Sequence, residues 1–379
     1  MRRTLLTALL VLAALPTPLA GQTDQEPWRD SFYPIVSYSG NDGIALAARF
    51  ALNKRAPWEA PYFYSGRLIA DLGYSASGSY LASLRFHAPG LRPDWRLDAI
   101  ATATQQSRFE FYGVGEDTRY HSDSAASSQR YYYKVRRTQQ QARAQLSRRL
   151  VGHLWITGTA EYKVTTFHDL PGPSLYTSFF ADGRQETDAI GRAALVFDSR
   201  ENDYDTHHGI LLDAGVLTGS FGNGYQQWVA EGRAWVPFGE WRSTWLSLRG
   251  VAAGSTGDVP LDARLYLPVF EGQVRVLGGA ESHRGMLDQR YIGRDLLFGN
   301  VTVHHDLVNG GGLLAAGLMV FADAGRVFEN EKFSLTTEGM KIGGGAGFYL
   351  RLMQTGVYTF NFAEGPDGFV FTLGNSWMF

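Results

Sequence analysis

The sequence predicts an all-β fold, a transmembrane antiparallel β-barrel of about 16 strands with a long luminal loop. Three observations favour this class. Apolar and polar residues alternate along extended segments. Many of these segments read as about ten residues or more, whereas strands of soluble proteins are usually about five or six residues long. Long and short connections also alternate along the chain, as they do in outer-membrane barrels.

The N-terminus is predicted to be a signal peptide, residues 1–20, that is removed from the mature protein. Arg2 and Arg3 precede an apolar stretch over residues 4–15, and small residues follow near Ala20. The apolar stretch is too short for a membrane anchor. Residues 21–30 are expected to form a short polar leader and residues 31–379 one outer-membrane β-barrel domain.

The composition excludes several classes of protein. The chain has no cysteine, which excludes disulfides, thiolate metal sites and cysteine nucleophiles. Its net charge is −2, so no basic field indicates a nucleic-acid partner. Beyond the signal there is no run of 18 apolar residues, so any membrane crossing must use strands. Composition alone leaves a secreted soluble β protein as an alternative.

Alternation with period two defines the expected strands. Leu68 and Leu72 lie on one face of such a segment, while Arg67 and Asp71 lie on the other. In a membrane barrel the apolar face contacts lipid and the polar face lines the lumen. The strands are expected near 32–39, 43–53, 62–74, 77–88, 94–107, 129–149, 152–168, 187–198, 208–220, 224–237, 241–255, 294–308, 313–328, 338–350, 355–363 and 368–379.

The connections divide between the two ends of the predicted barrel. The long connections 108–128, 169–186 and 256–293 all follow odd-numbered strands, so they emerge on one side. Tight turns at 151–152 and 237–240 emerge on the other. Long extracellular loops and short periplasmic turns are the expected asymmetry.

Aromatic residues gather near the predicted strand ends, which is typical of two interfacial girdles. These residues are Trp58, Tyr62, Phe63 and Tyr64; Tyr131, Tyr132 and Tyr133; Trp235 and Phe238; Trp241 and Trp245; and Trp377 and Phe379.

The C-terminus carries a predicted barrel-closure signal, formed by Phe371, Leu373, Trp377 and Phe379. These residues alternate with others up to the last residue of the chain, where most soluble proteins fray. We therefore expect the last strand to pair with the first, which would remove both edges of the sheet.

Three segments of the second half resemble the bacterial surface antigen family, the BamA/TamA-like barrels. They are the loop around Arg284-Gly285, the strand around Asp323 and Gly325, and the stretch from Asp198 and Arg200 to Gly209. Two-partner secretion transporters belong to the same superfamily. The resemblance covers roughly residues 190–379 and is expected to concern the barrel domain only, without periplasmic domains.

The resemblance implies that Arg284, at the tip of the loop, reaches the barrel wall and pairs with Asp323. A guanidinium matches a carboxylate in a bidentate geometry, and Gly285 beside it permits close approach of the backbone. The sequence departs from the family at His283 and Met286, which replace a small aliphatic and an aromatic residue. Histidines 207 and 208 stand where the family has a proline before Gly209.

No metal site, cofactor or catalytic set is expected. His207 and His208, like His304 and His305, are adjacent, and neighbouring residues of a strand point to opposite faces. His168, Asp169 and Ser174 could be read as a hydrolase set, but the sequence has no nucleophile-elbow motif. The glycines of residues 343–347 are expected to allow a kink or close packing against the luminal loop.

The predicted function is that of an integral protein of the bacterial outer membrane that assembles, inserts or translocates polypeptides or lipids. Its expected partners are outer-membrane lipid and lipopolysaccharide, the barrel-assembly machinery, and a periplasmic partner or polypeptide client. The alternative is a passive channel or structural barrel, which the predicted luminal Arg67, Arg85, Arg96 and Arg149 would suit. An outer-membrane hydrolase is a third and weaker hypothesis.

Overall fold

The fold was analysed in a computed structural model, which describes residues 27–39, 41–56, 62–121, 129–203, 205–238, 243–310, 314–352, 356–374 and 376–379. The predicted signal peptide and most of the polar leader lie outside these residues. Within the described ranges, no helix is long and apolar enough to cross a membrane.

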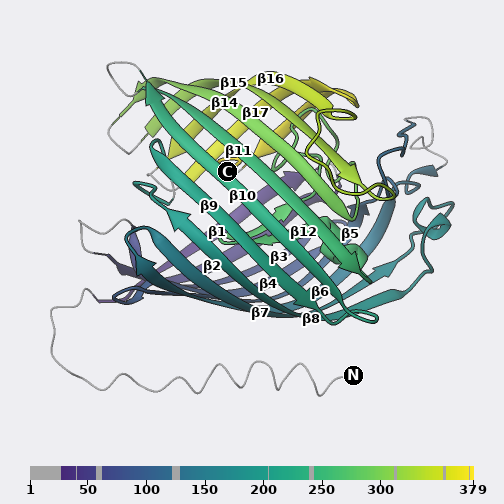
Figure 1. Cartoon of the computed structure of the whole chain (residues 1–379), viewed down its shortest axis with the longest axis horizontal. Helices are drawn as coiled ribbons and strands as arrows, with labels where there is room; N and C mark the ends of the chain where they lie inside the picture. Colours follow the sequence, from purple (N-terminus) through teal and green to yellow (C-terminus); the bar gives the residue numbers. More distant parts are fainter. Residues whose placement is uncertain are drawn as a thin grey trace.

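Among the described residues, sixteen strands form one antiparallel sheet in which each strand pairs with its neighbours along the chain, and the sheet curves into a barrel (Figure 1). The strands are β1 (Arg29–Ser39), β2 (Gly43–Arg55), β3 (Tyr64–Ser75), β4 (Tyr80–Arg92), β5 (Trp95–Glu110), β6 (Lys134–Val151), β7 (Leu154–His168), β8 (Arg184–Asp198), β9 (Gly209–Gly219), β10 (Tyr225–Phe238), β11 (Thr244–Gly257), β14 (Asp295–Asn309), β15 (Leu314–Phe328), β16 (Lys341–Leu352), β17 (Gly356–Gly365) and β18 (Gly368–Gly374). The all-β barrel predicted from the sequence is confirmed.

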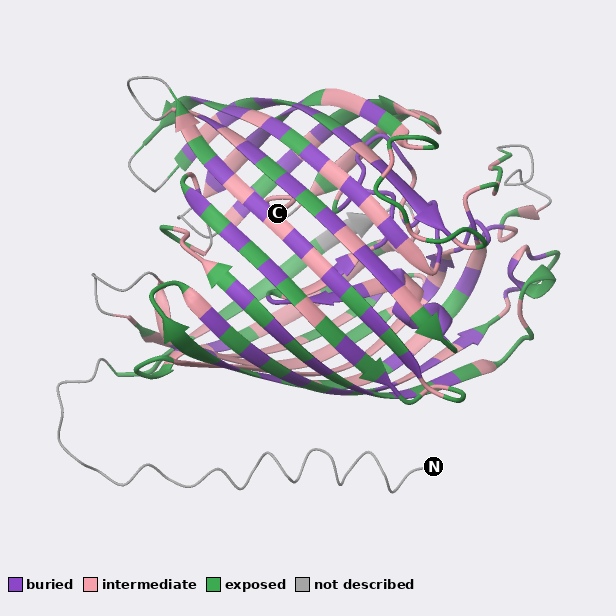
Figure 2. Ribbon diagram, viewed as in Figure 1, coloured by how far each residue is buried: buried purple, intermediate pink, exposed green. Residues whose placement is uncertain are grey.

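Period-two alternation explains which side chains face the lumen. Along β8, Arg192 and Val196 are buried inside the barrel, while Ala193, Leu195 and Phe197 are exposed outside. The same pattern repeats on neighbouring strands, so buried and exposed residues alternate across the wall in Figure 2. Polar groups therefore line the lumen and apolar groups cover the outside, as a barrel in hydrocarbon requires.

The connections follow the predicted parity, and the largest contains structure of its own. Residues 258–294, after β11, hold the short helix α2 (Leu261–Leu265) and a hairpin of β12 (Tyr266–Val269) and β13 (Gly272–Arg275). The sequence predicted a loop here but neither of these elements. The strand expected to start at residue 129 begins at Lys134 instead, because the residues before it form turns.

The predicted closure of the sheet is wrong in this structure. Among the described residues β1 pairs only with β2, β18 pairs only with β17, and no hydrogen-bonded ladder joins β1 to β18. The last strand ends at Gly374 rather than at residue 379. Beyond it the chain turns into the lumen, where Trp377 and Phe379 pack against a buried aromatic cluster. Burial of these rings replaces the strand pairing that the alternation predicted.

The predicted aromatic girdles are correct in part. Phe238 is exposed on the outside of β10, but Trp235 and Trp245 are buried in the lumen. Residues 235 and 238 are an odd number of positions apart, so they cannot share a face of one strand. On the same outward face of β10, Trp228 lies ten residues from Phe238, near the other end of the strand. At a strand tilt of about 45° this spacing spans about 24 Å, close to the apolar band of about 25 Å of such barrels. Trp58 and Trp241 lie outside the described residues.

Candidate functional site

The connection between β11 and β14, residues 258–294, folds back into the barrel and forms its luminal loop, as predicted. Apolar side chains of this loop and of the wall form one buried cluster. From the loop it contains Leu267, Val269, Val274, Leu277, Met286 and Tyr291, and from the wall Val229, Val251, Ala253, Leu296, Phe298 and Val327. The loop thus supplies half of a hydrophobic core that a hollow barrel would lack.

At the loop tip, Arg284 forms a bidentate ion pair with Asp323 of β15. The Arg284 Nε atom is 2.9 Å from Asp323 Oδ2, and Nη2 is 2.7 Å from Oδ1. The Arg284 backbone nitrogen and Asn300 Nδ2 each donate a further bond of 2.9 Å to the carboxylate. The guanidinium also donates to Thr302 at 3.0 Å and lies 3.6 Å from the ring centroid of Phe321. The two side chains are 2% and 0% exposed, so removing either one would strand a buried charge.

Glycines allow the loop tip to reach the wall. A Cβ atom on Gly285 would lie 2.8 Å from the carbonyl oxygen of Glu364 on β17. A Cβ atom on Gly343 of β16 would lie 2.6 Å from the imidazole of His283, and Gly325 is equally crowded by a leucine of the loop. The prediction that glycines of residues 343–347 pack against the luminal loop is therefore confirmed at Gly343.

A second anchor of the loop lies at α2. Asp262 accepts hydrogen bonds from Arg137 Nε at 3.1 Å and Gln139 at 3.0 Å, and its carboxylate is 3.0 Å from the Lys163 ammonium. Burial alone would raise the pKa of Asp262, but Arg137 and Lys163 outweigh burial and hold that pKa well below its usual range. Glu186 of β8 accepts the first two backbone N–H groups of α2, at 2.9 and 3.0 Å, which satisfies donors that a helix start leaves open.

A third anchor holds the turn of the β12–β13 hairpin. The carboxylate of Glu271 bridges Arg200 at 2.5 Å and Arg233 at 2.7 Å, and the Phe270 backbone nitrogen donates to Asp213 at 2.7 Å. Arg200 belongs to the connection after β8, an even-numbered strand, whereas the loop enters after the odd-numbered β11. The hairpin therefore extends through the lumen to the opposite end of the barrel.

The motif residues Asp198, Arg200 and Gly209 shape the turn that meets this hairpin. Asp198 accepts hydrogen bonds from Arg200 Nε at 2.9 Å and from Arg96 Nη1 at 3.3 Å. Gly209 has a φ of +124°, and a Cβ atom there would lie 2.6 Å from the Ser199 carbonyl oxygen. This backbone position excludes other residues, and the turn presents Arg200 to Glu271.

The four residues of the predicted closure signal separate into two pairs. Phe371 and Leu373 are exposed on the outside of β18, whereas Trp377 and Phe379 lie in the lumen. The indole of Trp377 donates a hydrogen bond of 3.0 Å to Asp205. The rings packed around Trp377 and Phe379 are those of Trp235, Trp245, His304 and Tyr349.

Two cavities of about 450 and 470 Å³ lie beside the luminal loop among the described residues. Arg284 lines the first and Arg233 the second, and Trp377 and Phe379 line both. Side chains of the luminal loop and of the C-terminal residues are thus packed inside the barrel.

The residues considered for catalysis or metal binding do not assemble into a site. His304 is buried inside while His305 faces outward, and no cluster of three metal-binding side chains occurs among the described residues. Ser174 Oγ accepts a hydrogen bond from a backbone nitrogen, and His168 lies 3.8 Å from Asp182 rather than beside Ser174.

Sequence reasoning missed Asp262 and Glu271, the anchors that precede the loop tip. A usable signal was present, because Arg137, Lys163 and Arg233 occupy inward positions of long strands. Buried charges need partners of opposite sign, and the acidic residues of the long connection were the candidates to supply them.

No family model and no curated protein matches the sequence. Among solved structures, BamA from Haemophilus ducreyi lacking POTRA domains 1–3 is similar to 92% of this chain and 69% of its own, with a TM-score of 0.59 and 12% identity. Two CdiB structures are also similar. CdiB from Acinetobacter baumannii matches 91% of this chain and 58% of its own, with a TM-score of 0.57 and 13% identity. CdiB from Escherichia coli matches 91% of this chain and 61% of its own, with a TM-score of 0.57 and 14% identity. The chain thus spans about six tenths of each CdiB chain. Its fold is that of a BamA-like and CdiB-like β-barrel.

Proposed function

We propose that this chain is a multi-pass protein of the bacterial outer membrane that assembles, inserts or translocates polypeptides or lipids there. The observation that carries the proposal is the luminal loop held to the wall through the Arg284–Asp323 pair. The likeness of the fold to BamA and CdiB supports it. A barrel that passes or inserts a client needs a lumen that is closed at rest. The loop that closes this lumen must be able to leave it.

The chemistry of the anchors suits a releasable loop. Each anchor is an ion pair, and the gain from a buried ion pair is largely cancelled by the cost of removing both charges from water. A loop held by such pairs can be released when water or a charged client solvates both partners. Three anchors at the tip, at α2 and at the hairpin turn would then have to open together.

The proposed setting follows from the two faces of the wall. Outer-membrane lipid and lipopolysaccharide would surround the apolar outside, and the barrel-assembly machinery would insert the chain. A periplasmic partner or polypeptide client would approach the mouth where Arg200 meets Glu271. The proposal includes no catalytic group, cofactor or nucleic acid.

A passive channel or structural barrel is the second candidate. It is favoured by the basic residues around the 470 Å³ cavity, such as Arg85 and Arg233, which would suit an ion path. In that case the loop would be a permanent part of the core, and releasing it would serve no purpose.

A reducible crosslink separates the two candidates. The chain has no native cysteine, and the Arg284 backbone nitrogen lies 2.9 Å from Asp323 Oδ2, so a disulfide between these two positions would fix the loop tip to the wall. We expect Arg284→Cys/Asp323→Cys in lipid vesicles to fail to promote insertion of a urea-unfolded barrel polypeptide when oxidised, and to promote it after reduction. Wild-type protein and the corresponding double serine variant, treated with the same reductant, are the controls.

Equal activity in the oxidised and reduced states would contradict a releasable loop. Planar-bilayer conductance after deletion of residues 270–290 gives a second measurement. The deletion should open a pore that the loop closes, whereas the conductance of an already open channel should change little.

A further inference from the structure

A groove crosses the outside of the wall between β6 and β11, on the face that the barrel turns toward the membrane. Its volume is about 1230 Å³. A Cβ atom added to Gly158 or Gly191 would meet no other atom within 4 Å, so the space above the floor is open. The floor is made of the small residues Ala144, Gly158, Ala160, Gly191 and Ala193.

The strand register gives the course of this groove. It crosses six strands along the hydrogen-bonding direction, from Leu146 through Gly158, Ala193, Val216 and Trp228 to Gly254. Five steps of about 4.8 Å make a length of about 24 Å. Trp228 lies near the extracellular end of β10, whereas Gly158 lies in the periplasmic half of β7, so the groove runs obliquely to the plane of the membrane.

The distance that the groove covers along the membrane normal matches the thickness of one leaflet. Because the strands tilt by about 45°, a groove perpendicular to them descends about 17 Å over its length. This descent is roughly half the thickness of a hydrocarbon core of about 30 Å. The groove begins at the outer interface and ends near the middle of the membrane.

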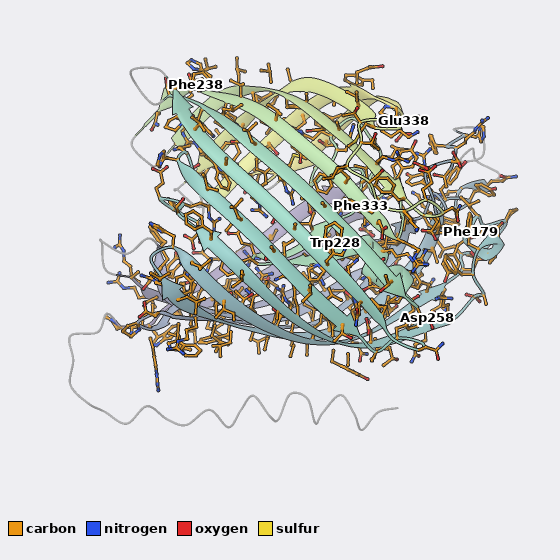
Figure 3. All side chains as sticks on the ribbon, viewed as in Figure 1. Phe179, Trp228, Phe238, Asp258, Phe333 and Glu338 are labelled. Carbon is orange, nitrogen blue, oxygen red and sulfur yellow. The ribbon has the colours of Figure 1, made fainter. Side chains whose placement is uncertain are left out.

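Two residues of the connection between β15 and β16 border the outer end of the groove. The ring of Phe333 meets the indole of Trp228 edge to face, with centroids 4.9 Å apart, and Figure 3 shows the two side chains together on the outside of the barrel. Lys332 lines the same end and has no ion-pair partner within the part of the chain that the structure describes. An ammonium at this level of a membrane attracts the phosphate of a lipid.

We propose that this groove binds one acyl chain of a phosphate-bearing lipid of the outer leaflet, with the phosphate beside Lys332. A flexible chain can follow a floor of alanines and glycines and gain close packing that the surrounding lipid does not offer. A second copy of the protein fits less well, because a twofold dimer through this face would set groove against groove and leave the hollow unfilled. The proposal needs the barrel to lie in a membrane but does not depend on a role in translocation.

Native mass spectrometry of the detergent-solubilised barrel tests the proposal, with phosphatidylglycerol and diacylglycerol, which has no phosphate, as probes. The wild-type protein should retain one phosphatidylglycerol and hold it more strongly than diacylglycerol. Gly158→Leu/Gly191→Leu fills the groove with apolar side chains and should abolish retention of both lipids. Lys332→Gln should weaken the binding of phosphatidylglycerol about fivefold and leave the binding of diacylglycerol unchanged.

Ala322→Leu is the matched control, because Ala322 is an exposed small residue of β15 outside the groove. It should retain lipid like the wild type, and the heat-modifiability of every variant on gels shows that it is folded. If the groove variant does not fold, the Lys332→Gln result alone decides. The proposal is overturned if the folded groove variant or Lys332→Gln retains phosphatidylglycerol like the wild type, or if filling the groove converts a dimer to a monomer. None of these outcomes bears on the Arg284→Cys/Asp323→Cys experiment.

Discussion

Two regions of the wall differ in how they are buried, although both are built from long antiparallel strands. Along β7 every second residue is buried, and the residues between them are exposed or intermediate. Along β4 most residues are intermediate or exposed, and the alternation is weak. Figure 2 shows the same contrast across the barrel. The luminal loop contacts the wall from β6 to β17, and it covers β2 to β4 far less.

The ion pairs of the two regions show the same contrast. Arg192 and Asp213, on β8 and β9, are each 1% exposed. Arg49 and Asp71, on β2 and β3, have a similar geometry with a distance of 2.6 Å, but they are 40% and 15% exposed. The comparison teaches that the sheet aligns the luminal charges, while the loop determines which of them are removed from water. The contribution of each luminal ion pair to the free energy of unfolding should therefore depend on whether the loop buries it, and not on the strand that carries it.

The largest effect is expected where the loop buries a charge most completely. Arg284→Ala leaves Asp323 buried without its partner, which should lower the free energy of unfolding by about 3–5 kcal/mol. Urea unfolding of the barrel in vesicles, followed by tryptophan fluorescence, measures this change, and loss of heat-modifiability at a lower temperature accompanies it. Asp323→Ala should lower the free energy of unfolding by a similar amount. An unchanged free energy of unfolding in both single variants would show that the Arg284–Asp323 pair does not stabilise the barrel.

The hairpin turn should give an intermediate effect. Glu271 is 31% exposed at the far mouth of the barrel, and Arg233 keeps a second partner in Glu231. Glu271→Gln should therefore destabilise the barrel by roughly 1–2 kcal/mol. The same urea titration measures it, and Glu281→Gln, at a half-exposed loop carboxylate, is the control. A loss as large as that of Arg284→Ala would mean that the two ends of the loop are buried equally.

Sequence reasoning recovered the features that depend on period-two alternation. The sixteen strands, the parity of the connections and the outward face of Phe371 and Leu373 all follow from which residues alternate. The approach of Arg284 to Asp323 came from a family resemblance, because no local pattern links residues 39 positions apart in the chain.

The remaining features depend on tertiary competition. Trp377 and Phe379 continue the alternation of β18, but an aromatic cluster in the lumen outweighs strand pairing. Likewise, the partner of Asp262 is fixed only when the loop meets Arg137 on a strand more than a hundred residues away. Alternation tells which face a side chain takes and not which element will cover that face.

A smaller effect is expected at the C-terminal residues, which contact the lumen through a hydrogen bond of Trp377 and through ring packing. Trp377→Phe keeps an aromatic ring but removes the N–H that donates to Asp205. We expect a loss of about 0.5–1.5 kcal/mol in the free energy of unfolding. Phe379→Leu, which removes no hydrogen bond, serves as a comparison in the same measurement. No loss at Trp377 would indicate that these residues leave the lumen in the membrane.

The smallest effect is expected in the region that the loop leaves uncovered. Water reaches Arg49, so its pair with Asp71 is screened and the stranded carboxylate can be hydrated. Arg49→Ala should lower the free energy of unfolding by no more than about 1 kcal/mol, and the loss should shrink further at high salt. Arg192→Ala, at the equivalent buried pair, should cost several times more and respond little to salt. The two sites share their strand geometry and differ in burial by the loop. Equal losses in the free energy of unfolding at Arg49 and Arg192 would therefore mean that burial by the loop does not determine the strength of luminal ion pairs.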